Sequence, residues 1–392
     1  LFNLLTMNNT IINYTFLFLA ILTGSYLCIL GGYGSDEDTL PMIGTFTNLL
    51  NGHFMTSRFT GYPVAEFIIG FFSYFFGSAV INLIIFFSFI LGSVIFYLSF
   101  ESKIRLENLV FFLIFLISNP ILFFDNLEPI DYSLAFLFFS LGYFFLVKQK
   151  FELSVIFFGI CIGTRINFAP FVLIIILFYN ENFLNNYFRK FSIIICSLFI
   201  GCLFYLPVWI NSGLGFDWLR AGRPDGGFIE YFARFLYKTI NTVGLFQLLI
   251  IIFSVNLFFE NLKKNRFSKM LICLIVANLG IFIYIPAELS YLQPMLIFLY
   301  YLIFKISKPK YIYFIIIINI VTWFTYFDYL KIEYKYKEPC DPTVATGASF
   351  KPQMKKGYLF NFLDTRSNIE CWININSVEG KKIRQGKPFR EM

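Results

Sequence analysis

The sequence has few charged residues and a single histidine, and these shortages exclude several kinds of protein. Only 14% of the 392 residues are charged, and the lysines and arginines lie between apolar segments or in a tail that also carries acids. Such a distribution predicts no nucleic-acid partner. His53 has no cysteine or second histidine near it in the sequence, which argues against a zinc site.

Further absences bear on transport and targeting. The chain has no internal repeat with charged or broken helices in both halves, as a secondary transporter would. Its apolar spans also lack the polar stripes that line a channel. The first apolar run, 11–30, has no basic segment before it and no small-residue cleavage site, so we expect a retained membrane helix.

Apolar residues are abundant instead, at 58% of the chain, and their runs reach the roughly 20 residues that a helix needs to cross a bilayer. The sequence therefore predicts an all-α polytopic membrane protein. Apolar spans are expected near 11–30, 77–100, 108–124, 132–147, 191–210, 236–259, 270–286, 291–305 and 311–328.

One further apolar stretch, 153–179, has two interpretations. It is either one helix with a buried Arg165 or two short passes that turn at the segment GTRINFAP. Two passes place nine of the twelve downstream lysines and arginines considered on the cytoplasmic side, and one pass reverses that ratio. We therefore predict about 11 transmembrane helices within residues 1–328, with the N-terminus in the cytoplasm.

This topology places the first outer loop, 31–76, on the non-cytoplasmic side with 125–131, the turn at Arg165 and 211–235. These segments contain nearly all the acids and arginines that are candidates for chemistry, so the site should face outward. Residues 329–392 form a small polar extramembrane tail, which we expect to be periplasmic. Its two cysteines, Cys340 and Cys371, either close a disulfide in an oxidising compartment or stay free.

The first outer loop is too long for a passive connector. Apolar residues at helical spacing within 40–50 predict an amphipathic helix on the membrane surface, and a second half-buried helix is expected from Pro63. Asp36 and Asp38 precede the first of these helices. An acid there caps a helix, which is the interpretation favoured for Asp38, whereas Asp36 stands where a general base would be placed.

An Asp-rich motif, a surface helix and then the segment SRFTGYP before the second crossing resemble the GT-C polytopic glycosyltransferases. The aminoarabinose transferases and protein O-mannosyltransferases are the most similar types. The GTR at 163–165 resembles the family's arginine between two short helices. The ELSYLQP at 288–294 resembles its Arg-Tyr-x-x-Pro segment, although serine stands at 290 where the family has arginine.

The resemblance implies a GT-C-like bundle and the transfer of a sugar from a polyprenyl-phosphate donor on the outer face, with inversion of the anomeric carbon. It implies that Asp36 is the base and that Asp38 completes an Asp-x-Asp pattern, which could hold a divalent cation. Glu288 and Tyr291 are candidates for sugar or acceptor binding through the resemblance alone.

The chemistry also requires groups that bind the leaving phosphate as it gains charge. Arginine stays charged and binds phosphate oxygens bidentately, so Arg58 and Arg165 are the predicted donor-phosphate ligands. The alternatives are a solvated Arg58 and an Arg165 that reaches lipid phosphates. Asp131 either contacts sugar hydroxyls or caps its helix, and Arg220 and Arg223 either bind sugar or acceptor or belong to an ordinary interfacial loop.

We therefore predict an inverting glycosyltransferase, a hexosyl- or pentosyltransferase of a bacterial inner membrane. Its active face would be non-cytoplasmic, and its acceptor an envelope lipid, glycan or protein. Two other classes remain. One is a polysaccharide polymerase or ligase that uses pyrophosphate-linked oligosaccharides, and the other is a nonenzymatic membrane subunit.

Overall fold

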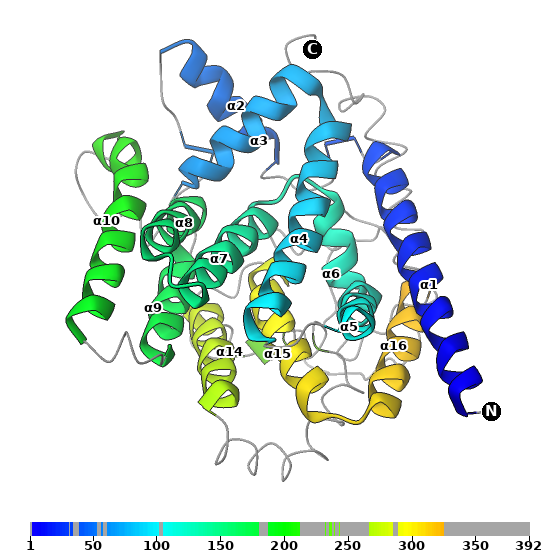
Figure 1. The fold of residues 1–392 in the computed structure, drawn as a ribbon. Coiled ribbons are helices and arrows are strands. Elements are labelled where there is room, and N and C mark those ends of the chain that lie inside the picture. Colours follow the sequence, from blue (N-terminus) through cyan, green and yellow to red (C-terminus); the bar gives the residue numbers. More distant parts are fainter. Residues whose placement is uncertain are drawn as a thin grey trace.

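The chain folds into a bundle of helices, and the described residues contain no other regular element (Figure 1). The computed structural model describes residues 2–30, 32–33, 39–52, 56–57, 61–101, 105–179, 187–211, 266–284 and 289–324, with five single positions between 232 and 243. The predicted all-α class is confirmed over these residues. The predicted span 236–259 and the tail 329–392 lie outside them, apart from three single positions in that span.

Four described helices are long and apolar enough to cross a membrane. These helices are α1 (Phe2–Leu30), α4 (Ser78–Phe100), α10 (Tyr187–Asn211) and α14 (Arg266–Tyr284). A fifth candidate is the bent pair α5 (Leu106–Ser118) and α6 (Pro120–Phe124). The shorter apolar helices are α3 (Pro63–Phe76), α7 (Asp131–Val147), α8 (Phe151–Thr164), α9 (Ala169–Phe178), α15 (Gln293–Ile306) and α16 (Pro309–Phe324). The chain is thus a helical membrane protein with four or five described span candidates.

The first outer loop contains the two helices expected there. They are α2 (Thr39–Leu50) and α3, which lie at one end of the bundle (Figure 1). The two pack closely because Gly70 has no side chain: a Cβ at this position would lie 2.3 Å from the Cβ of Phe46. The Phe46 ring also contacts Phe67 and Phe71 edge to face. Helix formation was therefore correctly predicted, and the placement of these helices on a membrane surface stays a prediction.

The span predicted near 108–124 bends by 94° between α5 and α6. The bend lies at Asn119, whose extended backbone follows from the proline after it, because proline disfavours the helical conformation of the preceding residue. The Asn119 side chain accepts a hydrogen bond from Leu122 N at 3.1 Å and so caps α6. Its amide also donates to the Tyr300 hydroxyl at 2.9 Å, which fixes the bend against α15.

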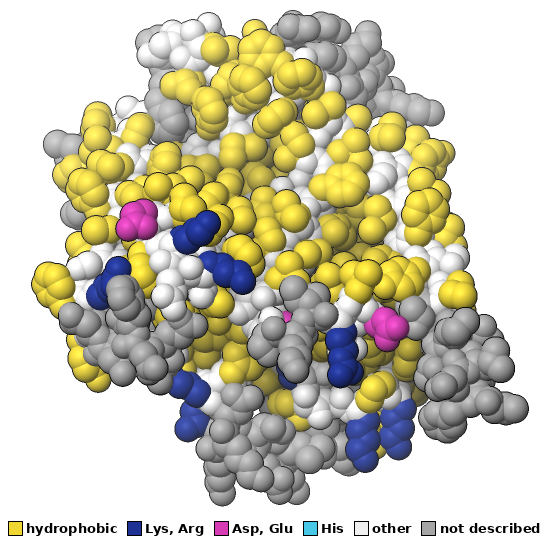
Figure 2. Space-filling model, viewed as in Figure 1, with side chains coloured by type: hydrophobic (Ala, Val, Ile, Leu, Met, Phe, Trp, Pro, Cys, Tyr) yellow, Lys and Arg dark blue, Asp and Glu magenta, His cyan; other side chains and the backbone are white. Residues whose placement is uncertain are grey.

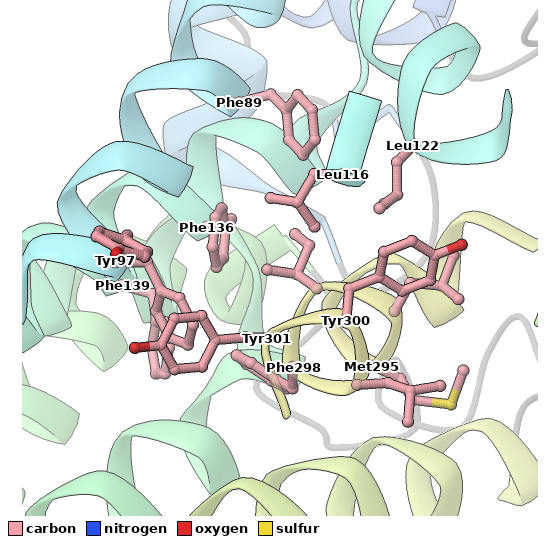
Figure 3. Close-up of a cluster of buried hydrophobic side chains, with 14 of the residues drawn as sticks. Phe89, Tyr97, Leu116, Leu122, Phe136, Phe139, Met295, Phe298, Tyr300 and Tyr301 are labelled. Atoms are coloured by element: carbon pink, nitrogen blue, oxygen red, sulfur yellow. The ribbon is translucent and has the colours of Figure 1, made fainter. Parts of the chain in front are cut away.

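Helix α15 lies inside the bundle and is buried from Gln293 to Ile303. Its side chains point in several directions into the apolar core (Figure 3). Tyr301 packs edge to face on Phe96 of α4, and Tyr300 stacks on Phe115 of α5. Because neighbouring helices cover this helix, it positions the segment that precedes it, η5 (Leu289–Leu292), inside the protein as well.

The chain reverses direction at Arg165, between α8 and α9. The Phe151 ring at the start of α8 lies 4.2 Å from the Arg189 guanidinium at the start of α10, and Lys190 donates to Leu177 O at the end of α9. The turn itself lies about 24 Å farther along α10, where Ile166 N donates to the Tyr205 hydroxyl at 3.1 Å. Helices α8 and α9 therefore run in opposite directions, as two short passes require.

The described charged residues are divided between the two ends of the bundle largely according to sign. One end, here called the basic end, holds all but one of the eleven described lysines and arginines, and these are Arg105, Lys148, Lys150, Arg189, Lys190, Arg266, Lys269, Lys305, Lys308 and Lys310. Contacts such as the Lys305–Glu101 ion pair and the Phe100–Phe267 ring pair join the helix ends that carry them. In Figure 2 the blue side chains gather in the middle and lower parts of the visible face, whereas the upper part is largely hydrophobic.

The opposite end, here called the acidic end, has the remaining arginine, Arg165, and four of the seven described acids. Glu66, Glu128 and Asp131 are buried there, and Asp125 is partly buried. The candidate site lies at this end.

Candidate functional site

Arg165 is the largest fully buried side chain described in the protein, with 0% of its surface exposed. It stands at the turn between α8 and η2 (Ile166–Phe168), in extended backbone, and its backbone N–H still donates to Cys161 O at 2.9 Å. The α8 helix therefore ends one residue before it. A buried guanidinium is costly unless it is paired, so its partners determine whether the site is stable.

Asp131 is the ionic partner of Arg165. Arg165 Nη1 donates to Asp131 Oδ2 at 2.5 Å, and both side chains are completely buried. Asp131 is the first residue of α7, where a carboxylate is also favoured by the helix dipole. The Nη2 group of Arg165 donates to the hydroxyl of Tyr132, the next residue. The start of α7 thus supplies both a charge and a neutral acceptor to one guanidinium.

Three tyrosine rings surround the same guanidinium. The Arg165 Cζ atom lies 3.4 Å from the ring centroid of Tyr132, 4.7 Å from that of Tyr291 and 4.8 Å from that of Tyr62. Cation–π contacts of this kind are strongest where water is excluded, as it is here. The site therefore joins segments that are distant in the sequence: the start of α3, the start of α7, the α8–α9 turn and η5.

The η5 segment is held by a second set of hydrogen bonds. Asp125 Oδ2 accepts from Gln293 Nε2 at 3.1 Å and from Ser290 Oγ at 3.4 Å. On the other side, Asn278 Nδ2 of α14 donates to Tyr291 O at 3.1 Å. Ser290, which stands where the GT-C segment has arginine, is thus in contact with a carboxylate, and the backbone around Tyr291 is fixed from two directions.

Glu66 is a functional candidate that the sequence reasoning missed. This α3 residue is 1% exposed and accepts hydrogen bonds from the backbone N of Ser57, at 2.9 Å, and from the Ser57 hydroxyl. It therefore ties the segment next to Arg58 to α3. An acid within the apolar sequence of α3 was a signal that could have found it, because such an acid needs a partner.

The structure brings three of the predicted site residues together: Arg165, Asp131 and Tyr291. Tyr62 and Tyr132 complete the cluster and were not predicted, since a tyrosine in an aromatic-rich chain gives no signal of its own. The other predicted residues lie outside the described part of the chain, and they are Asp36, Asp38, Arg58, Arg220, Arg223, Glu288, Cys340 and Cys371. His53, where no zinc site was expected, also lies outside it. Within the described part, no group of three or more histidines, cysteines or acids could hold a metal ion.

In this arrangement Arg165 has a structural role. Because the guanidinium is closed off by rings and neutralised by Asp131, it holds four segments together at the acidic end. A phosphate could reach Arg165 only after one of these rings moved away. Its Nε group forms no hydrogen bond in the described structure, so one donor remains for a further acceptor.

Comparison with protein-family models, with curated proteins and with solved structures found no match to this chain.

Proposed function

We propose that this protein is an inverting glycosyltransferase of the GT-C type, which moves a sugar from a polyprenyl-phosphate donor to an envelope lipid, glycan or protein. The observation that supports it best is the buried Asp131–Arg165 pair with its tyrosines at the acidic end, opposite the basic end. Buried charges within a membrane protein are costly and commonly mark functional sites.

The proposed orientation follows from the charges. Lysines and arginines concentrate in cytoplasmic loops, so the basic end would lie in the cytoplasm of a bacterium and the acidic end would face the periplasm. The reversal at Arg165 supports two short passes at α8 and α9, and with them a total of about 11 crossings. The first outer loop, which includes Tyr62, would then lie on the face where polyprenyl-linked sugars are used.

In the proposed reaction, an acceptor hydroxyl attacks the anomeric carbon while the bond from that carbon to the phosphate oxygen breaks. Asp36 takes the hydroxyl proton as general base, and the leaving polyprenyl phosphate keeps the bonding electrons. Asp38 would assist Asp36, with or without a divalent cation. Arg58 would bind the leaving phosphate, and the contact of Glu66 with Ser57 supports this role because it fixes the neighbouring residue.

The proposed role of Arg165 on the donor phosphate needs a second arrangement of the site, in which a tyrosine ring has moved. In the described arrangement Arg165 is a positioning residue that holds Tyr62 against α7 and η5. Asp131, Tyr291, Glu288, Arg220 and Arg223 remain candidates for sugar or acceptor binding.

The proposal is tested by mass spectrometry of lipid extracts from cells that carry the wild-type protein, Asp36→Asn or the control Glu107→Gln. Glu107 is an exposed acid at the basic end. We expect a polyprenyl monophosphate sugar to accumulate in Asp36→Asn alone, because loss of a general base slows proton transfer by about 10²–10⁴-fold. Folded protein should remain at the wild-type amount. Accumulation of a pyrophosphate-linked oligosaccharide would favour a polymerase or ligase, and unchanged lipids would favour a nonenzymatic subunit.

A further inference from the structure

Two cationic side chains at the basic end share a single backbone oxygen. Lys190 Nζ donates to Leu177 O at 3.2 Å, and Arg266 Nη2 donates to the same oxygen at 3.4 Å. Leu177 lies in the last turn of α9, where carbonyl groups have no partner within the helix. One cation is enough to satisfy this carbonyl. The presence of two brings like charges from α10 and α14 together.

Among the described residues, these two cations have no acidic partner. Neither Lys190 nor Arg266 forms an ion pair in the described structure, although Lys190 is only 8% exposed. Like charges so close to each other repel, and burial weakens the screening by water. This location therefore attracts an anion with several acceptor oxygens.

The surface beside the two cations is apolar and exposed. Phe188 and Phe191, in the first turns of α10, have 75% and 61% of their surface exposed. In a membrane protein such side chains contact acyl chains, and the basic helix ends lie at the level of the lipid headgroups. The anion that fits both the cations and the apolar flank is the phosphate of a lipid, and anionic lipids are enriched in the cytoplasmic leaflet.

We propose that Lys190 and Arg266 bind the phosphate of an anionic phospholipid between the ends of α9, α10 and α14. Arg266 contributes the guanidinium donors that Leu177 does not use, and Lys190 contributes a compact charge. The acyl chains lie against Phe188 and Phe191. This lipid site is at the opposite end of the bundle from the Arg165 cluster, and it does not depend on the proposed transferase activity.

The test is native mass spectrometry of the full-length protein in detergent, titrated with phosphatidylglycerol. The variant is Lys190→Gln with Arg266→Gln. The matched control is Lys308→Gln with Lys310→Gln, which removes the same charge from the basic end at two exposed positions at the start of α16. We expect the variant to bind phosphatidylglycerol at least about tenfold more weakly, because it loses two charge-assisted contacts. The control should bind as the wild type does.

Equal binding by the wild type and the variant would overturn the proposal. Displacement of phosphatidylglycerol by millimolar inorganic phosphate would show an anion site without a lipid preference, and would overturn the lipid assignment. Equal affinity for phosphatidylcholine would do the same. Since Arg266 is exposed, Arg266→Gln alone provides the comparison if the double variant does not fold, and it should weaken binding in the same direction.

Discussion

Charged side chains at the two ends of this bundle differ in how deeply they are buried. At the acidic end Arg165, Asp131 and Glu66 are buried and hydrogen-bonded to one another or to nearby segments. At the basic end nearly all the lysines and arginines are exposed or partly exposed, and Lys190 is the exception. Exposed charge costs little and can orient a chain in a membrane, whereas buried charge must be matched by partners. The comparison predicts large effects at one end and small effects at the other.

The largest effect is expected from breaking the Asp131–Arg165 pair on one side only. Arg165→Met leaves the Asp131 carboxylate buried without its cation, which should lower the free energy of unfolding by about 3–5 kcal/mol. The double variant Arg165→Met with Asp131→Asn should lose less, because neither buried charge remains. Thermal unfolding of the purified proteins in detergent measures both. A double variant no more stable than Arg165→Met would contradict this view of the pair.

A smaller effect is expected at the close contact that supports the Arg165 turn. A Cβ on Gly163 of α8 would lie 2.5 Å from the Phe204 ring of α10, so Gly163→Ala should overpack the contact and cost about 1–3 kcal/mol. Gly280→Ala is the matched control, since a Cβ there meets nothing within 4 Å. The midpoints of thermal unfolding should separate the two variants. Equal midpoints would mean that α8 and α10 can move apart freely.

The third prediction distinguishes the contribution of the Tyr132 hydroxyl to stability from that of the Tyr132 ring. Tyr132→Phe removes the acceptor for Arg165 Nη2 but keeps the ring on the guanidinium, which should cost about 1–3 kcal/mol of stability. Tyr132→Leu removes both and should cost about 0.5–2 kcal/mol more. The difference between the two unfolding midpoints measures the ring contact. No difference between Phe and Leu would remove the cation–π contribution from the account of the site.

The smallest effect is expected at the basic end. Lys305 pairs with Glu101, but 35% of its side chain is exposed and Glu101 also accepts from the Tyr301 hydroxyl at 3.0 Å. Lys305→Gln should therefore lower stability by about 0–1 kcal/mol, and Lys308→Gln, at an exposed position, by about half of that or less. A loss at Lys305 as large as that for Arg165→Met would remove the contrast between the two ends.

Hydropathy alone located most of the helices. Each apolar segment in a membrane must satisfy its own backbone hydrogen bonds, and a helix does this without help from other segments. The bend at Asn119 had a local signal in the following proline and was missed within an otherwise apolar span. Arg165 was identified as an arginine within an apolar stretch, Asp131 as an acid at the start of a helix, and Tyr291 through the family resemblance alone. Their meeting was not predictable, because residues 131, 165 and 291 are joined only by the packing of separate helices. Tyr62 and Tyr132 carry no signal before that packing is known.

The burial of α15 on every side has a consequence for how the protein is made. During synthesis a segment enters the bilayer before its neighbouring helices have packed around it. Helix α15 must therefore be stable first in contact with lipid and later in contact with other helices. Gln293 and the Tyr301 hydroxyl find their partners on segments made much earlier. The Tyr300 hydroxyl accepts from Asn119, also made earlier, and from Asn319 of α16, which is made later. Helix α15, in the last third of the chain, thus fills the interior of a bundle formed largely by the first half. A chain whose synthesis stops before α15 lacks this central helix.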